Sequence, residues 1–109
     1  MDFKEYQEKS VETVVDLGER DNLIHFTFGL AGEVGEVTEK IKKVHRDKGF
    51  EFDDDDKKYL EKELGDVLWY TSQLATALSL SLNEIAEKNT AKLQSRKTRG
   101  KLLGSGDDR

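Results

Sequence analysis

Two long stretches of the chain repeat apolar residues every three or four positions, and this repeat constrains the fold more than any other feature. The first begins between Asn22 and Thr27 and runs to about Lys48, and the second runs from about Asp55 to Leu78. No proline interrupts either stretch, because the chain has none. No segment alternates in the manner of a strand, so the sequence predicts an all-α fold. The predicted stripes are Phe26, Leu30, Val34, Val37, Ile41 and Val44, then Leu60, Leu64, Val67, Leu68, Thr71, Leu74, Ala75 and Leu78.

Two further helices are expected, one on each side of this pair. Residues 2–17 follow a helical period and are followed by Gly18, which predicts the end of a first helix. Ser81 and Glu84 form a capping-box pattern, so a fourth helix is expected to begin there and to reach about Thr98. We therefore expect a four-helix bundle-like protomer.

The composition suggests that such a protomer has a thin core. The chain has 109 residues, of which 35% are hydrophobic and 38% charged. This length fits one domain, expected over residues 1–99, followed by a flexible C-terminal tail over residues 100–109. We expect the protomer to complete its core by oligomerisation.

Several classes of function are disfavoured by the residues that are scarce or absent. With no cysteine and two histidines, thiolate chemistry and a typical zinc site are not expected. The net charge of −5 argues against binding to polymeric nucleic acid. The chain starts with charged residues rather than a signal-like apolar run, and no stretch is long enough to cross a membrane, so a cytoplasmic location is expected.

Two acidic pairs lie at the edges of the two long apolar stripes. Glu33 and Glu36 are three residues apart, as are Glu63 and Asp66, so each pair shares one side of its helix. On a helical wheel Glu33 borders the apolar stripe and Glu36 lies one step further round. Such pairs are often solvated surface. Two of them on facing helices would instead repel strongly, and a hard divalent cation is the simplest group to neutralise them.

The last predicted helix has an unusual polar stripe. Asn89, Lys92 and Arg96 follow one another at helical spacing where a core-facing stripe is expected. The two cations either form ordinary salt bridges with the acidic pairs or bind phosphate oxygens around a metal ion.

Two other features allow structural explanations. Gly29, Gly32 and Gly35 all fall within the second predicted helix, so either the helix begins later or these small residues admit a closely packed neighbour. The run of four aspartates, residues 53–56, is interpreted as an N-cap with favourable charge at the start of the third helix.

Taken together, these motifs resemble those of the MazG-like nucleoside triphosphate pyrophosphohydrolases, an all-α family. The resemblance rests on Glu33-x-x-Glu36, a 26-residue interval, Glu63-x-x-Asp66, and then Asn89-x-x-Lys92-x-x-x-Arg96. It extends over about residues 3–100, and the combined pattern is more specific than any single motif.

The resemblance implies Mg²⁺-dependent cleavage of a nucleoside triphosphate between its α and β phosphates, with Mn²⁺ as a substitute ion. The products would be a nucleoside monophosphate and pyrophosphate, in standard metabolism or in removal of non-standard nucleotides. It implies a homodimer or homotetramer. The implied catalytic and metal-binding residues are Glu33, Glu36, Glu63 and Asp66, and the implied substrate-binding residues are Asn89, Lys92 and Arg96.

Some alternatives remain open at the level of sequence. Trp69 and Tyr70 are candidates for stacking on the base, but for Trp69 a place in the core or an interface is the favoured interpretation. A non-catalytic, metal-stabilised helical interaction module is the alternative function, and a purely structural helical dimer is a third. The preferred base and sugar are not fixed by the sequence, and His25, Arg46 and residues 47–56 are the candidates for reading them.

Overall fold

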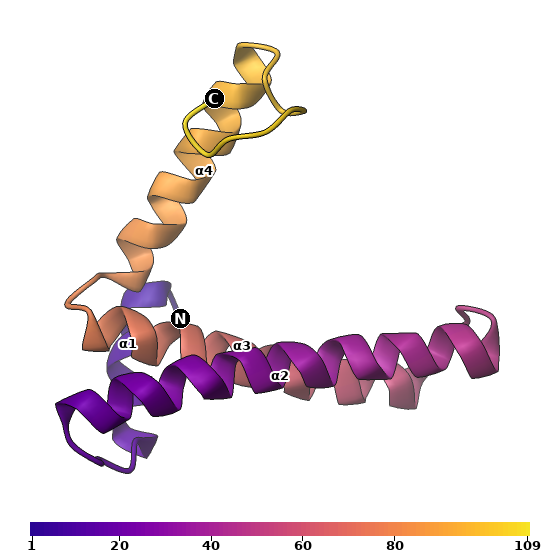
Figure 1. Ribbon diagram of the computed structural model, residues 1–109, viewed down its shortest axis with the longest axis horizontal. Coiled ribbons are helices and arrows are strands. Elements are labelled where there is room, and N and C mark those ends of the chain that lie inside the picture. The colour runs from indigo at the N-terminus through magenta and orange to yellow at the C-terminus, as the bar shows by residue number, and fades with distance from the viewer.

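A computed structural model describes all 109 residues and contains only helices. As Figure 1 shows, α2 and α3 lie side by side as a long pair, α1 packs near the C-terminal end of α3, and α4 projects away from them. The all-α prediction is therefore confirmed. The elements are α1 (Phe3–Ser10), the short 3-10 helix η1 (Val11–Thr13), α2 (Glu19–Lys48), α3 (Asp54–Ala77) and α4 (Leu82–Thr98).

The first helix is shorter than predicted, because α1 ends at Ser10 and only the single turn of η1 follows it. Local hydrogen bonds explain the difference. Asp16 accepts hydrogen bonds from the backbone N–H of Gly18 and the side-chain amide of Asn22, and Asn22 in turn accepts one from the N–H of Leu17. Side-chain bonds of this kind compete with a continuing helix. The expected helix over residues 2–17 is thus wrong in its second half.

The second helix begins earlier than predicted, at Glu19. Consequently Gly29, Gly32 and Gly35 all lie inside α2, and a later start does not explain them. A Cβ atom at Gly29 would collide with the ring of Tyr70 on α3, whereas Gly32 and Gly35 face open space. Only Gly29 is required for close packing within the protomer, and its close neighbour is a side chain.

The aspartate run begins α3 as predicted. Asp53 is the N-cap, and it forms a reciprocal capping box with Asp56. Asp56 is also only 1% exposed and contacts Lys40 and Lys48. The predicted cap at Ser81 is confirmed too, since its hydroxyl accepts a hydrogen bond from the N–H of Glu84.

The fourth helix departs from the expected bundle. Leu82 is buried at the base of α4, and the side chain of Gln7 on α1 accepts a hydrogen bond from its N–H. Beyond this base α4 stands apart from the α2–α3 pair (Figure 1). The polar stripe along α4 offers no continuous apolar surface that would hold it against that pair. Within one protomer the four helices therefore do not close into a bundle.

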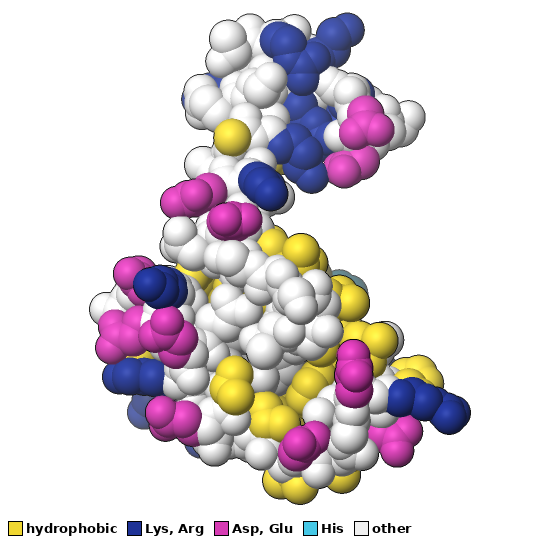
Figure 2. All heavy atoms as spheres, turned by 90° about the vertical axis from the view of Figure 1, so that its left-hand side faces the viewer, with side chains coloured by type: hydrophobic (Ala, Val, Ile, Leu, Met, Phe, Trp, Pro, Cys, Tyr) yellow, Lys and Arg dark blue, Asp and Glu magenta, His cyan; other side chains and the backbone are white.

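The buried core is small, as the composition predicted. Its apolar members are Phe26, Val44, Ala75 and Leu82. Large apolar residues are exposed on every helix, among them Phe28, which is 72% exposed. Figure 2 shows apolar side chains gathered on the body below α4, while Lys and Arg gather on α4 itself. None of the helices combines the length and the apolar character needed to cross a bilayer.

Candidate functional site

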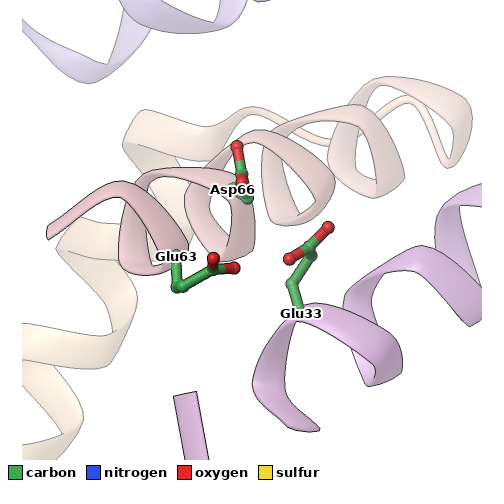
Figure 3. Close-up of side chains that lie close together, drawn as sticks. All are labelled: Glu33, Glu63 and Asp66. Carbon is green, nitrogen blue, oxygen red and sulfur yellow. The ribbon is translucent and has the colours of Figure 1, made fainter. Parts of the chain in front are cut away.

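Three carboxylates from the two long helices converge at one point. Glu33 reaches from α2 toward α3, where Glu63 and Asp66 lie one helical turn apart (Figure 3). One carboxylate oxygen from each residue lies within 4.8 Å of the others. The predicted acidic pairs thus meet across the α2–α3 seam, because each borders an apolar stripe that packs against the other helix.

This cluster has an excess of negative charge. The pKa of Glu33 is raised, first by partial burial, then by a hydrogen bond shared with Glu63 and by the nearby charges of Asp66, Glu63 and Glu36. No Lys, Arg or His forms an ion pair with any of these four carboxylates. The protein therefore holds several like charges together without supplying a counter-charge.

The fourth predicted carboxylate, Glu36, lies beside the cluster rather than within it. It is exposed, and the hydroxyl of Tyr59 on α3 donates a hydrogen bond to its Oε2 over 3.3 Å. Tyr6 of α1 is another neighbour, since burial and the charge of Asp66 raise its pKa. Tyr59 precedes Glu63 by four residues, so the sequence places both on one flank of the helix, whereas Tyr6 was not found because its proximity depends on how α1 packs on α3.

The donor set suits a hard divalent cation. All three converging groups are carboxylates, and Mg²⁺ prefers oxygen ligands, which it combines with water or phosphate oxygens. Neither histidine belongs to the cluster, and the chain has no cysteine, so softer metals have no preferred ligand there. A bound divalent cation would also relieve the repulsion that raises the pKa of Glu33.

The polar stripe of α4 is not brought to the carboxylates of its own chain. Lys92 and Arg96 both contact the side chain of Asp107 in the C-terminal segment, and Arg96 also donates to the carbonyl of Asp107. Arg96 is consequently buried, whereas Asn89 is exposed. Within one protomer, salt bridges between these cations and the acidic pairs are therefore not formed.

The two candidate stacking residues have packing roles in this structure. The indole N–H of Trp69 donates a hydrogen bond to the hydroxyl of Thr13 over 2.8 Å, and its ring meets Phe26 edge-on. The ring of Tyr70 lies against Gly29 and makes an edge contact with Trp69. A direct contact of either ring with a substrate remains a prediction.

Comparison with known proteins identifies the family of the chain. A family model described as the MazG nucleotide pyrophosphohydrolase domain matches residues 23–100. The Gene 37 protein of Mycobacterium phage L5 is 42% identical over 109 residues, covering 95% of this chain and 96% of that protein. No solved structure gives a significant match. The matched region includes both acidic pairs and the polar stripe of α4, and the chain belongs to the MazG nucleotide pyrophosphohydrolase family.

Proposed function

We propose that this protein is a nucleoside triphosphate pyrophosphohydrolase that depends on Mg²⁺ or Mn²⁺. It cleaves its substrate between the α and β phosphates and releases a nucleoside monophosphate and pyrophosphate. The observation that supports this most strongly is the cluster of Glu33, Glu63 and Asp66, which lacks any cationic partner in a chain of this family. The reaction consumes one water, whose oxygen forms a new bond to phosphorus as the bridging P–O bond breaks.

All four carboxylates are proposed to bind the metal. Glu33, Glu63 and Asp66 would bind it directly, and Glu36 would join them from its position beside Tyr59. When bound, the divalent ion supplies charge neutralisation for the triphosphate and lowers the pKa of water. Packing of α2 against α3 would keep the carboxylates in place before the substrate arrives, which would limit reorganisation during the reaction.

The cations of α4 are proposed to act on a neighbouring copy of the chain. Asn89, Lys92 and Arg96 suit phosphate and sugar contacts, but α4 projects away from its own carboxylates (Figure 1). The exposed apolar side chains leave a surface for association, so we propose a homodimer or homotetramer in which α4 completes the site of its partner. We propose that the enzyme acts in the cytoplasm, where nucleotide pools lie.

Mixing two inactive variants tests this division between copies. Glu63→Gln removes a metal ligand, and Arg96→Gln removes a phosphate contact. If α4 acts on the partner, mixed oligomers contain sites with both defects and sites with neither, so activity reappears on subunit exchange. Each variant kept alone is the control. Mass spectrometry checks that subunit exchange is complete. If the mixture is then still inactive, Glu63 and Arg96 act in the site of the same chain.

Product analysis tests the reaction itself. The protein is incubated with each of a panel of nucleoside triphosphates and Mg²⁺, and the products are followed by ³¹P NMR. We expect resonances of a nucleoside monophosphate and pyrophosphate in equal amounts, and none with Glu63→Gln. Release of a nucleoside diphosphate and phosphate would contradict the proposed bond, and no cleavage of any substrate with Mg²⁺ or Mn²⁺ would favour the non-catalytic module.

A further inference from the structure

The C-terminal segment, residues 101–109, folds back along the last turns of α4 (Figure 1). Gly104 and Gly106 have φ angles of 113° and 92°, which glycine adopts far more readily than other residues, and they turn the chain back toward the helix. The guanidinium of Arg109 then donates hydrogen bonds to the carbonyls of Leu102 and Gly106. The segment therefore follows a defined path beside α4.

The side chain that this segment brings to α4 is the carboxylate of Asp107. Its Oδ1 atom lies 2.9 Å from the ammonium nitrogen of Lys92 and 3.3 Å from a guanidinium nitrogen of Arg96. Arg96 also donates a hydrogen bond to the backbone carbonyl of Asp107. Hydrogen bonds from Lys92 and then Arg96 hold the pKa of Asp107 below its ordinary value, so an anion is held between the two cations.

Arg96 is covered by this contact. It is only 5% exposed, although the outer part of α4 stands apart from the other helices (Figure 1). The hydrogen bonds and the ion pair of its guanidinium all go to Asp107. Since no other helix covers this part of α4, the C-terminal segment is what removes Arg96 from solvent. A phosphate group could not reach Arg96 while the segment is in place.

The carboxylate of Asp107 can be exchanged for a phosphate. Lys and Arg bind both kinds of anion through the same charge-assisted hydrogen bonds. The side chain of Asp107 is 80% exposed, and exposed ion pairs contribute little to stability. A triphosphate carries more negative charge and more acceptor oxygens than one carboxylate, so it should displace Asp107.

Little apolar surface holds the segment against α4. No apolar residue lines the hollow of about 210 Å³ that lies between them. Leu103, within the segment, is 92% exposed and Leu102 is 47% exposed. Detachment of the segment would therefore transfer little buried apolar surface to water, and the charged contacts of Asp107 are the main ones to be replaced.

We propose that residues 101–109 form a strap that closes over the phosphate-binding cations of α4 in the absence of substrate, with Asp107 in the place of a phosphate, and that the triphosphate opens it. The inference rests on the proposed function for the role of Lys92 and Arg96, but the contacts of Asp107 are independent of that role. Such a strap lowers the apparent affinity for substrate by the fraction of molecules that are open. It raises KM and leaves the chemical step unchanged.

Kinetics of Asp107→Asn test the strap. The substitution removes the charge and keeps the size of the side chain, so we expect KM for the preferred triphosphate to fall about fivefold with kcat unchanged. Asp108→Asn is the matched control, because Asp108 is exposed, adjacent and takes part in none of these contacts. Its KM should equal that of the original chain. Equal falls in KM in both variants would show that only the overall charge of the segment matters, which overturns the strap.

Binding of inorganic tripolyphosphate tests the same contact apart from catalysis. The full chain and its Asp107→Asn variant are titrated in the absence of a divalent metal and followed by ¹H–¹⁵N NMR. We expect binding to release the strap of the original chain, seen as lower heteronuclear NOE values at Gly104 and Gly106. The variant should bind tripolyphosphate about fivefold more tightly.

The possible failures are distinguishable. Shifts at Lys92 and Arg96 on titration, with Gly104 and Gly106 unchanged, would show that phosphates bind without opening the strap and would overturn the inference. A higher KM or a lower kcat in Asp107→Asn would show that the segment assists the reaction, which also overturns it. Release of the strap by tripolyphosphate without cleavage of any nucleoside triphosphate would support the strap and contradict the proposed reaction.

Discussion

The α2–α3 pair holds two groups of carboxylates that the protein treats in opposite ways. At one end of the pair, Asp56 is almost fully buried, yet Lys48 and Lys40 hold it at 2.9 Å each. Further along the same seam, Glu33 and its two partners converge with no cation at all. The charge of the first group is balanced by lysines of the same chain, whereas the negative charge of the second group is not balanced by any cation.

The position of Lys40 shows that this difference is not caused by a shortage of cations. Lys40 lies one turn beyond Glu36 on α2, and its ammonium group is above the ring of Tyr59. It pairs with Asp56 rather than with Glu36 or the cluster. Carboxylates that stabilise a fold are paired with cations, and carboxylates left together without them are candidates for function.

The largest expected effect is on catalysis, from Glu63→Gln. Removing one carboxylate ligand should lower turnover about a hundredfold or more, because charge stabilisation is the main catalytic contribution. Tm in the presence of EDTA should be equal to or higher than that of the original chain, since a repulsive charge has gone. Glu61→Gln, exposed on the same helix, is the control. Turnover and melting curves are measured on the same samples. Turnover equal to that of the original chain in a folded Glu63→Gln variant would show that Glu63 is not part of the site.

The paired group should respond in the opposite way. Asp56→Asn leaves Lys40 and Lys48 without their buried partner and weakens the cap of α3, so we expect a clear fall in Tm. Turnover per folded molecule should be little changed. Asp55→Asn, exposed in the same aspartate run, is the comparison. Equal Tm for the two variants, measured by circular dichroism, would show that burial and pairing of Asp56 have no special role.

The stability that the paired carboxylate Asp56 provides should be lost at low pH. Hydrogen bonds from Lys48 and then Lys40 hold the pKa of Asp56 well below its ordinary value. The unfolded chain therefore binds a proton more readily, so the stabilisation from Asp56 is complete above the unfolded pKa of about 3.9 and is lost as pH falls toward the lower folded value. We expect urea midpoints to decrease from about pH 5 to pH 2, and less steeply in Asp56→Asn. Parallel curves would contradict this assignment.

The glycines of α2 provide the smallest expected effects. Gly29→Ala should destabilise the protein by about 1–3 kcal/mol, because its Cβ would collide with Tyr70. Gly35→Ala, where the protomer leaves open space, should gain up to about 1 kcal/mol from helix propensity. Urea unfolding measures both. If Gly35→Ala instead lowers the free energy of unfolding, by an amount that depends on protein concentration, a partner chain packs against Gly35.

The sequence predicted the helices, and which carboxylates border the packed side of the long pair, better than it predicted how the helices are arranged. Glu33 and Glu63 were predictable because each borders an apolar stripe, and the stripe determines which side of a long helix is packed. The end of α1 was not, since it depends on bonds between Asp16 and Asn22 that compete with a weak helical signal. The projection of α4 depends on contacts between distant elements, which no local pattern specifies.

Thermal melting with and without Mg²⁺ tests the central claim most directly. A ligand that binds the folded state raises Tm, so Mg²⁺ should stabilise the original chain and the Asp56→Asn variant alike. It should give little or no shift in Glu63→Gln, where the cluster has lost a ligand. An equal Mg²⁺ shift in Glu63→Gln, or its loss in Asp56→Asn, would contradict the assignment of the unpaired carboxylates as the metal site.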